Sequence, residues 1–313
     1  MRKEIPGVGV LSYHVGTPSC TTCLHNPLHG GIWLRNYHSN EVGTLGCIVN
    51  DNKSGTPYML SNQHVFLPGV VTAPYSKPMI GDIVLQPPFG TEQRVVGHVA
   101  KNKGPASTRY PKNTPVSAIE ADIRNHVVED FYDASLANLS TKFSYEIPNI
   151  GIPTGHEEPK IGMPIASLTG RSGLLAGEVA ASTVNSLGTL PDGSIQVSLN
   201  IFHSTQEWGP GDSGSLIINL ANRKAIGLIY ATQYPNGGGT PVHLACKTTT
   251  IAKAYDINFV GRKGTFNPDG SLSTTPSPTP HPLPYPDFGI SPEILVGGAV
   301  VGLGVAALVI FTH

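Results

Sequence analysis

Short stretches of apolar and β-branched residues alternate along most of the chain with clusters of glycine, proline, asparagine and aspartate. Such stretches are typical of β-strands, and the clusters between them are typical of turns. Residues 195–199 also alternate apolar and polar side chains, as a half-buried strand does. The pattern predicts strands at residues 31–35, 43–49, 57–61, 83–85, 94–100, 195–199, 216–218, 225–231 and 241–244, a glycine-punctuated hairpin at 170–179 and a short helix at 248–255.

The predicted strands form two groups, which are separated by a stretch rich in proline and glycine at residues 139–164. Many short strands in two groups predict an all-β fold with two packed antiparallel β-barrels. Residues 101–115, polar and proline-containing, are expected to form a surface loop. The expected domains are an N-terminal extension (1–29), a first β-barrel (30–145), a second β-barrel (146–262), a Pro-rich linker (263–293) and a transmembrane helix (294–311).

The last two segments differ from the rest of the chain. The proline density after residue 263 favours an extended polyproline-type stalk. Residues 294–311 are an uncharged apolar run without a polar face, long enough to span a bilayer as a helix. No apolar signal-peptide region follows the N-terminus, so we expect a single-pass C-terminal membrane anchor with the barrels on the cytoplasmic side.

Among the glycines of the apolar run, Gly298 and Gly302 lie four positions apart. Small residues at this spacing allow two helices to approach closely, which predicts a homo-oligomer formed through the transmembrane helix. A monomeric anchor, or a tail buried in a capsid or partner protein, are the alternatives.

The amino-acid composition limits the kinds of molecule that the protein is expected to bind. The 313 residues include 36 Gly and 28 Pro, only 13% are charged, and the net charge is −1. Because the sequence has no basic stripe or Arg-rich run, we expect no nucleic-acid partner. We expect no cofactor either.

Four cysteines are too few for a disulfide framework in a chain of this length. Cys47 and Cys246 are expected to be buried small apolar residues. Cys20 and Cys23 precede two histidines, His25 and His29, and could hold zinc, form a local disulfide or remain free thiols. The spacing is too tight for a standard zinc finger, so we expect no metal.

Candidate chemistry centres on a glycine-rich run, Gly209-Pro210-Gly211-Asp212-Ser213-Gly214-Ser215. Glycines allow the backbone to fold tightly around Ser213, which can present a nucleophile and an oxyanion hole from the same few residues. A plain glycine-rich hairpin is the alternative. A histidine, His64, ends an earlier apolar run, and an aspartate, Asp133, follows at Phe131-Tyr132-Asp133.

In this order, His64, Asp133 and Ser213 resemble the triad of a trypsin-like (chymotrypsin-fold) serine peptidase of the bacterial and phage-type branch. The resemblance covers residues 30–255 and also includes Gly-Thr-Leu-Gly-Cys-Ile-Val at 43–49, Leu-Ser-Asn-Gln-His-Val at 60–65 and the glycine pattern from Gly170 to Gly177. It implies two six-stranded-type barrels with the active site in the cleft between them.

The resemblance also implies roles for individual residues. Ser213 would be the nucleophile, His64 its base and Asp133 the group that orients His64, with Asp122 and Asp130 as competing candidates for the third role. The N–H groups of Gly211 and Ser213 would form the oxyanion hole.

The residue six positions before the serine, Glu207, would form the base of the specificity pocket. It would favour a basic side chain at P1, the residue on the amino side of the cleaved bond. Tyr230, Ala231 and Thr232 would form one pocket wall, and Thr232, in place of a common glycine, would narrow the entrance. No activation sequence is found, so Asp212 is expected to have an internal partner.

The sequence therefore predicts a serine endopeptidase that acts on polypeptide substrates and is tethered to a membrane by its C-terminus. Two alternatives remain: a catalytically silent peptide-binding module on the same fold, and a structural or virion protein that cleaves only itself.

Overall fold

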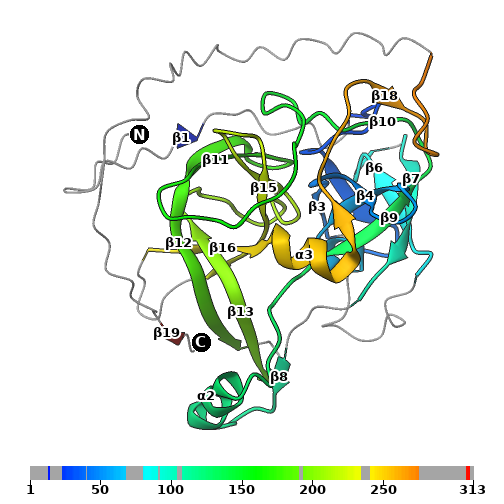
Figure 1. The fold of residues 1–313 in the computed structure, drawn as a ribbon. Helices are drawn as coiled ribbons and strands as arrows, with labels where there is room; N and C mark the ends of the chain where they lie inside the picture. Colours follow the sequence, from blue (N-terminus) through cyan, green and yellow to red (C-terminus); the bar gives the residue numbers. More distant parts are fainter. Residues whose placement is uncertain are drawn as a thin grey trace.

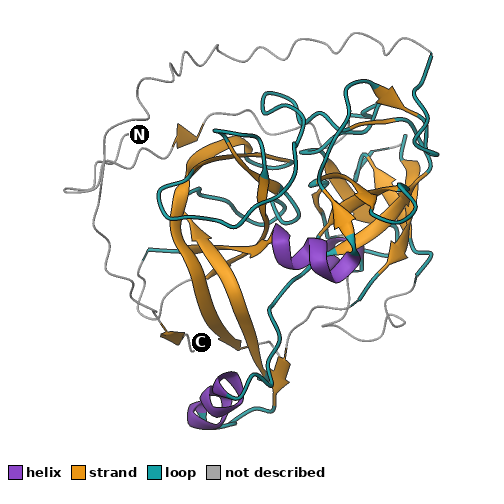
Figure 2. Ribbon diagram, viewed as in Figure 1, coloured by secondary structure: helices purple, strands orange, loops and turns teal. Residues whose placement is uncertain are grey.

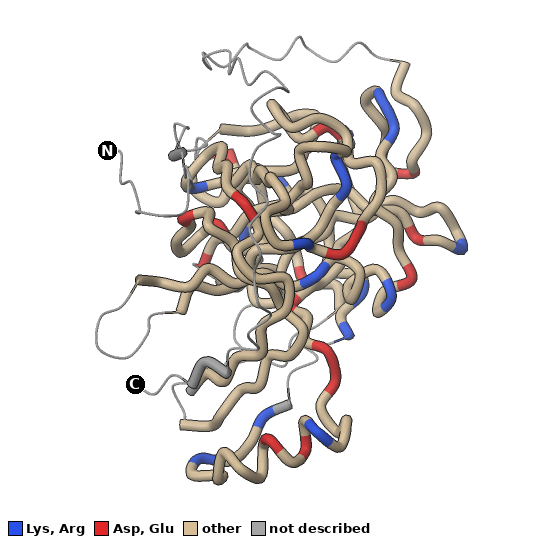
Figure 3. Tube along the Cα trace, turned by 60° about the vertical axis from the view of Figure 1, so that its left-hand side comes forward, with Lys and Arg blue, Asp and Glu red and all other residues tan. Residues whose placement is uncertain are grey.

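A computed structural model describes residues 13–14, 23–39, 41–67, 80–90, 92–103, 108–189, 193–233, 240–274 and 308–310. Two curled β-sheets lie side by side, and helices contribute little to either (Figure 1, Figure 2). Acidic and basic residues are interspersed along the chain trace (Figure 3). The predicted all-β fold is confirmed as a mostly-β structure built on two sheets.

The first sheet contains β2 (Trp33–Asn36), β3 (Gly43–Thr44), β4 (Cys47–Asp51), β5 (Pro57–Ser61), β6 (Ile83–Gln86), β7 (Arg94–Lys101), β9 (Ser135–Leu139) and β17 (Ile257–Asn258). Its order is β17-β4-β5-β9-β7-β6-β2-β3. Because β3 and β4 are successive parts of one stretch of chain, the pairing of β2 with β3 closes the sheet into a barrel. Alternate inward side chains, including Leu34, Met59 and Val99, fill its core.

The second sheet is built around β11 (Pro164–Thr169), β12 (Gly173–Thr189), β13 (Ile195–Ser204), β14 (Leu216–Asn219), β15 (Ala225–Gln233) and β16 (Val242–Lys247). These strands pair in the order β12-β11-β14-β15-β16-β13, and β13 pairs back to β12, so this sheet is also closed. Its core includes Val179, Phe202 and Ile229.

Three helices are found in the described part of the chain: α1 (Gln63–Phe66), α2 (Val116–Arg124) and α3 (Thr248–Tyr255). The predicted helix at 248–255 is confirmed as α3. The predicted surface loop at 101–115 is wrong in part, because β8 (Thr108–Tyr110) pairs with β13.

Helix α2 was not predicted. It begins after Pro115, which has no N–H to leave unsatisfied at a helix start. Its buried Ile119 packs with Leu187, Val197 and Leu199 of the long β12–β13 hairpin. The part of the chain around α2 therefore lies on the second barrel, at the lower end of this hairpin in Figure 1, although its residues fall within the predicted first-barrel range.

Three further segments cross the predicted domain boundaries, because they bury apolar surface on the first barrel. Leu28, predicted in the N-terminal extension, is fully buried, and its N–H donates to the carbonyl of Lys142 (2.9 Å). In the predicted linker, β18 (Thr265–Phe266) pairs with β10 (Phe143–Ser144), and the rings of Phe266 and Phe143 stack with centroids 5.6 Å apart. Strand β17, predicted in the second barrel, pairs with β4 of the first.

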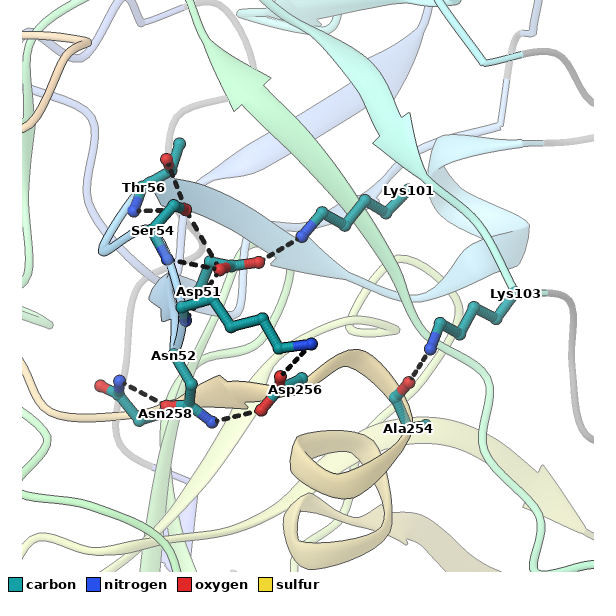
Figure 4. Close-up of polar contacts among 10 residues, drawn as sticks. Asp51, Asn52, Ser54, Thr56, Lys101, Lys103, Ala254, Asp256 and Asn258 are labelled. Atoms are coloured by element: carbon teal, nitrogen blue, oxygen red, sulfur yellow. Dashed lines mark hydrogen bonds and ion pairs between the residues drawn. The ribbon is translucent and has the colours of Figure 1, made fainter.

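A polar network fixes the end of α3 to the first barrel (Figure 4). The carboxylate of Asp51 accepts from the ammonium of Lys101 (2.5 Å), and the amide of Asn52 donates to Asp256 (3.0 Å) just after α3. The ammonium of Lys103 donates to the carbonyl of Ala254. The hydrogen bond from Lys101, with further hydrogen bonds from Ser54, lowers the pKa of Asp51 below its usual range. These contacts hold the end of α3, where the chain leaves the second barrel, against the first barrel.

Most of the predicted transmembrane helix at 294–311 lies outside the described residues. At Leu308–Ile310 the structure has a strand, β19, that pairs in parallel with Asn185–Leu187 of β12, so the helix prediction does not hold at these three positions. Near the other end of the chain, β1 (Tyr13–His14) also pairs with β12. The helices within the described ranges are all too short or too polar to cross a bilayer.

Candidate active site

His64 and Asp133 come from neighbouring strands of the first barrel. His64 lies in α1, three residues after the end of β5, and Asp133 lies two residues before β9. The last residue of β5, Ser61, is paired with the first residue of β9, Ser135. The pairing of β5 with β9 therefore brings His64 and Asp133 together, although 69 positions separate them.

Their side chains are in direct contact. His64 Nδ1 lies 2.5 Å from Asp133 Oδ2, and the N–H of Gln63 donates to Asp133 Oδ1 (2.8 Å). The amide of Asn62 donates to the Asp133 carbonyl (2.6 Å). The Asp133 side chain is only 12% exposed, whereas that of His64 is 44% exposed. The carboxylate thus holds one ring nitrogen, and the other edge of the imidazole remains accessible.

The two competing aspartates are engaged elsewhere. Asp122, in α2, accepts from the hydroxyl of Tyr110 (2.9 Å), and Asp130 accepts from the amide of Asn200 (2.9 Å). Among the three candidates, Asp133 is the one that contacts His64.

The environment of His64 raises its pKa above the ordinary value of 6.5. Loss of water around the ring lowers this pKa, but the charge and hydrogen bond of Asp133, with a smaller contribution from Glu41, outweigh that effect. The pair therefore stabilises the protonated imidazole.

Behind Asp133 lies a buried cysteine. The N–H of Asp133 donates to Cys246 Sγ (3.3 Å), and burial raises the pKa of the Cys246 thiol. Cys47 and Cys246 are both free and buried, which confirms the prediction for them. Cys23 is disulfide-bonded. Cys20 lies outside the described residues.

The loop that carries Ser213 lies between β13 and β14 of the second barrel and requires its glycines. Gly211 (φ 98°) and Gly214 (φ 92°) have left-handed backbones that side chains disfavour. A Cβ on Gly211 would lie 2.6 Å from the Trp33 ring, and one on Gly214 would lie 2.2 Å from Ser61 Oγ. The loop is thus packed directly on the first barrel, beside the strand that leads into His64.

The predicted internal partners of Asp212 are found. Its buried carboxylate accepts from the N–H groups of Gly209 (2.9 Å), Arg171 (3.2 Å) and Ser172 (3.0 Å), and from the Ser172 hydroxyl (2.6 Å). These four hydrogen bonds come from neutral donors in two loops. They replace the water that the buried carboxylate has lost. The loop around Ser213 is therefore clamped by the folded chain itself.

Two N–H groups of the loop remain unused. Within the described residues, neither the N–H of Gly211 nor that of Ser213 has a hydrogen-bond acceptor in the protein. An oxyanion hole requires N–H donors that no protein acceptor occupies.

Thr44 is a site residue that the sequence reasoning missed. It is fully buried, and its N–H donates to the carbonyl of Ser213 (2.8 Å). Its hydroxyl donates to the carbonyl of Gly211 (2.9 Å) and accepts from the N–H of Gly170 (2.9 Å). Its own carbonyl accepts from the Ser61 hydroxyl (2.7 Å). Thr44 therefore joins the Ser213 loop to the first barrel.

A pocket of about 240 Å³ lies beside Ser213. It is lined by Trp208, Gly209, Pro210, Ser213, Tyr230, Ala231 and Thr232. The predicted wall residues Tyr230, Ala231 and Thr232 are thus at the pocket. Glu207 is exposed and is not among the lining residues, so the structure does not place it at the base of this pocket. The side chain that follows it, Trp208, lies there instead.

Among the described residues, no group of three or more His, Cys, Asp or Glu side chains is arranged to hold a metal ion. The rings of His25 and His29 do lie close together, with centroids 5.0 Å apart. Burial and the neighbouring His29 lower the pKa of His25 to about 4.

No protein-family model matches the sequence, and no curated protein matches it. The structure is similar to the crystal structure of Nocardiopsis protease, with 15% identity, a TM-score of 0.45, and coverage of 74% of this chain and 97% of that chain. It is similar to Thermobifida fusca Protease A, with 13% identity, a TM-score of 0.47, and coverage of 75% of this chain and 100% of that chain. A catalytically inactive tobacco etch virus protease complexed with substrate is 11% identical, with a TM-score of 0.33, and is covered over 94% of its length by 78% of this chain. These similarities are distant, and the function has to be inferred from the site itself.

Proposed function

We propose that this protein is a serine endopeptidase. The observation that carries the proposal is the contact between His64 and Asp133 at 2.5 Å, together with a glycine loop that presents Ser213 beside the same strand. The clamped Asp212 and the two unused N–H groups of the loop support the same function.

In the proposed mechanism, the Ser213 hydroxyl attacks the carbonyl carbon of a peptide bond and transfers its proton to His64 Nε2. Asp133, bound to Nδ1, holds the tautomer with its lone pair on Nε2 and stabilises the imidazolium that forms. The N–H groups of Gly211 and Ser213 donate to the oxygen that becomes negative. His64 then returns the proton to the leaving amine, and water hydrolyses the acyl-enzyme by the same route.

A fluorophosphonate probe tests the proposed nucleophile, because it reacts with an activated serine and requires no knowledge of the substrate. We expect the wild-type protein to be labelled and Ser213→Ala to remain unlabelled. A folded wild-type protein that is not labelled would contradict the proposed nucleophile and favour the silent peptide-binding module.

Thr44 offers a test of how the loop is positioned. Thr44→Val keeps the shape of the side chain but removes the hydroxyl that holds Gly211 and Gly170. Because small displacements of reacting groups can cost about 100-fold, we expect kcat to fall about 10- to 100-fold with KM nearly unchanged. Steady-state kinetics with one fluorogenic peptide measure this effect.

Thr44→Ser is the matched control, because it retains the hydroxyl. It should recover most of the lost kcat. A Thr44→Val protein with wild-type kcat, or an equal loss in Thr44→Ser, would contradict the positioning role.

We also propose that residues 294–311 anchor the protein to a membrane, with the barrels on the cytoplasmic side and self-association through Gly298 and Gly302. The uncharged apolar run supports this. The anchor requires Leu308–Ile310 to leave β12, since the same backbone groups cannot pair with β12 and form a helix. The full chain should sediment with membranes and resist carbonate extraction, whereas a chain that ends at residue 274 should stay in the supernatant. A full chain that is soluble without detergent would contradict the anchor.

A further inference from the structure

We propose that Trp208 closes the pocket beside Ser213, so that the pocket accepts only a small, uncharged P1 side chain. This inference rests on the proposed peptidase function and adds the class of substrate. It replaces the prediction of a basic P1 residue.

The first argument is the position of the indole. Two stretches of the second barrel, residues 208–210 and residues 230–232, line the pocket together with Ser213. The indole N–H of Trp208 donates to the carbonyl of Ala231 (3.1 Å), and the Thr232 hydroxyl contacts the Trp208 carbonyl (3.4 Å). The indole therefore joins the two lining stretches, and in the proposal it limits the depth of the pocket.

The second argument is that the ring is held in place. Trp208 is only 7% exposed and belongs to the core of the second barrel with Val179, Phe202 and Ile229. Its ring also meets that of His243 edge-on, with centroids 5.1 Å apart. Rotation away from the pocket would break the hydrogen bond and expose this apolar contact, so a bulky substrate side chain cannot easily displace the indole.

The third argument is charge. All seven lining residues are uncharged, and Glu207 is exposed outside the pocket. His243, behind Thr232, is buried, and this burial lowers its pKa, whereas the charge of Glu207 acts in the opposite direction. A basic or acidic P1 side chain would lose its hydration without gaining a partner charge.

The fourth argument is size. The pocket volume of about 240 Å³ lies below the roughly 300–1,000 Å³ of typical ligand pockets. From the position of the indole, we expect the pocket to take a small side chain such as alanine or valine in preference to an aromatic one.

The test is a set of fluorogenic peptides that differ only at P1 (Ala, Val, Phe, Arg and Glu), used with protein already shown to react with the fluorophosphonate probe. We expect kcat/KM for Ala or Val to exceed that for Phe, Arg and Glu by about tenfold or more, the size of effect that pocket shape gives. In Trp208→Ala, the ratio of Phe to Ala should rise by about tenfold or more.

Trp208→Phe is the second variant, because Trp208→Ala removes a buried ring from the core and could prevent folding. Trp208→Phe keeps most of the apolar volume but loses the hydrogen bond to Ala231, and it should shift the same ratio in the same direction by less. The wild-type preference alone is already decisive, because it does not depend on either variant.

The outcomes separate the two proposals. A probe-reactive wild-type protein that prefers Arg, Glu or Phe, shows equal rates for all five peptides or cleaves none of them would overturn this inference and leave the serine nucleophile intact. Unchanged P1 preference in a folded Trp208→Phe or Trp208→Ala protein would also overturn it. A folded wild-type protein that does not react with the probe would overturn the proposed function, and this inference with it.

Discussion

Replacing Ser213 by alanine should lower the rate of peptide-bond hydrolysis by about a millionfold, the loss found when the nucleophile of a serine peptidase is removed. The expected loss is large because no other group in the mechanism can form the acyl-enzyme. Hydrolysis of a denatured protein substrate, followed by the appearance of new amino termini, measures it.

Ser117→Ala is the control for this experiment. Ser117 is an exposed serine of α2, which packs on the β12–β13 hairpin, and its loss should leave the rate unchanged. Intact mass should be compared at the same time, because a protein that only cleaves itself would show a mass difference between wild type and Ser213→Ala but no hydrolysis of added substrate. Substantial hydrolysis by a folded Ser213→Ala protein would rule out Ser213 as the nucleophile.

Asp133→Asn should lower kcat by about 10⁴-fold, because the amide favours the wrong imidazole tautomer and no longer stabilises the imidazolium. The pH profile should change as well. The base must be neutral, so activity rises with pH through the pKa of His64, which Asp133 raises above 6.5. Loss of the carboxylate lowers this pKa, and the remaining activity of Asp133→Asn should therefore rise at a lower pH than that of wild type.

Two other aspartates provide matched controls. Asp122→Asn and Asp130→Asn remove carboxylates whose partners, Tyr110 and Asn200, lie away from His64, and both variants should keep near wild-type kcat and the wild-type pH profile. Circular dichroism should confirm that Asp133→Asn is folded, since Asp133 also accepts from the backbone of Gln63. If either control loses more activity than Asp133→Asn, that aspartate and not Asp133 is the carboxylate that orients His64.

Local patterns were enough to predict the elements whose limits are set by nearby residues. Strand β5 occupies the predicted residues 57–61, and α3 occupies the predicted 248–255. The turn residues at 51–55 separate β4 from β5, and such residues act within a few positions of the chain. In contrast, α2 is stabilised by Ile119 on Leu187 and Val197, about 70 positions away, and no local pattern reveals such a contact.

The same distinction holds at the site. Ser213 and His64 stand in short motifs that can be recognised in isolation, whereas Asp133 is separated from Asp122 and Asp130 only by its contact with His64. Thr44 could not be recognised, because its hydroxyl meets the carbonyl of Gly211 across 167 positions of sequence. Glu207 was chosen by counting six positions back from Ser213, which assumes one loop conformation. In this structure Trp208 lines the pocket and Glu207 is exposed.

The pairing of β17 with β4 has a consequence for the order in which the molecule is completed during synthesis. Ile257 pairs with Asp51, so an edge strand of the first barrel is supplied by residues made after the whole second barrel. Contacts between such distant positions slow folding, and an unpaired strand edge invites association with other chains. The β4 edge therefore stays open on the ribosome from the emergence of the first barrel until residue 258 emerges, which makes this the period when the nascent chain most needs protection.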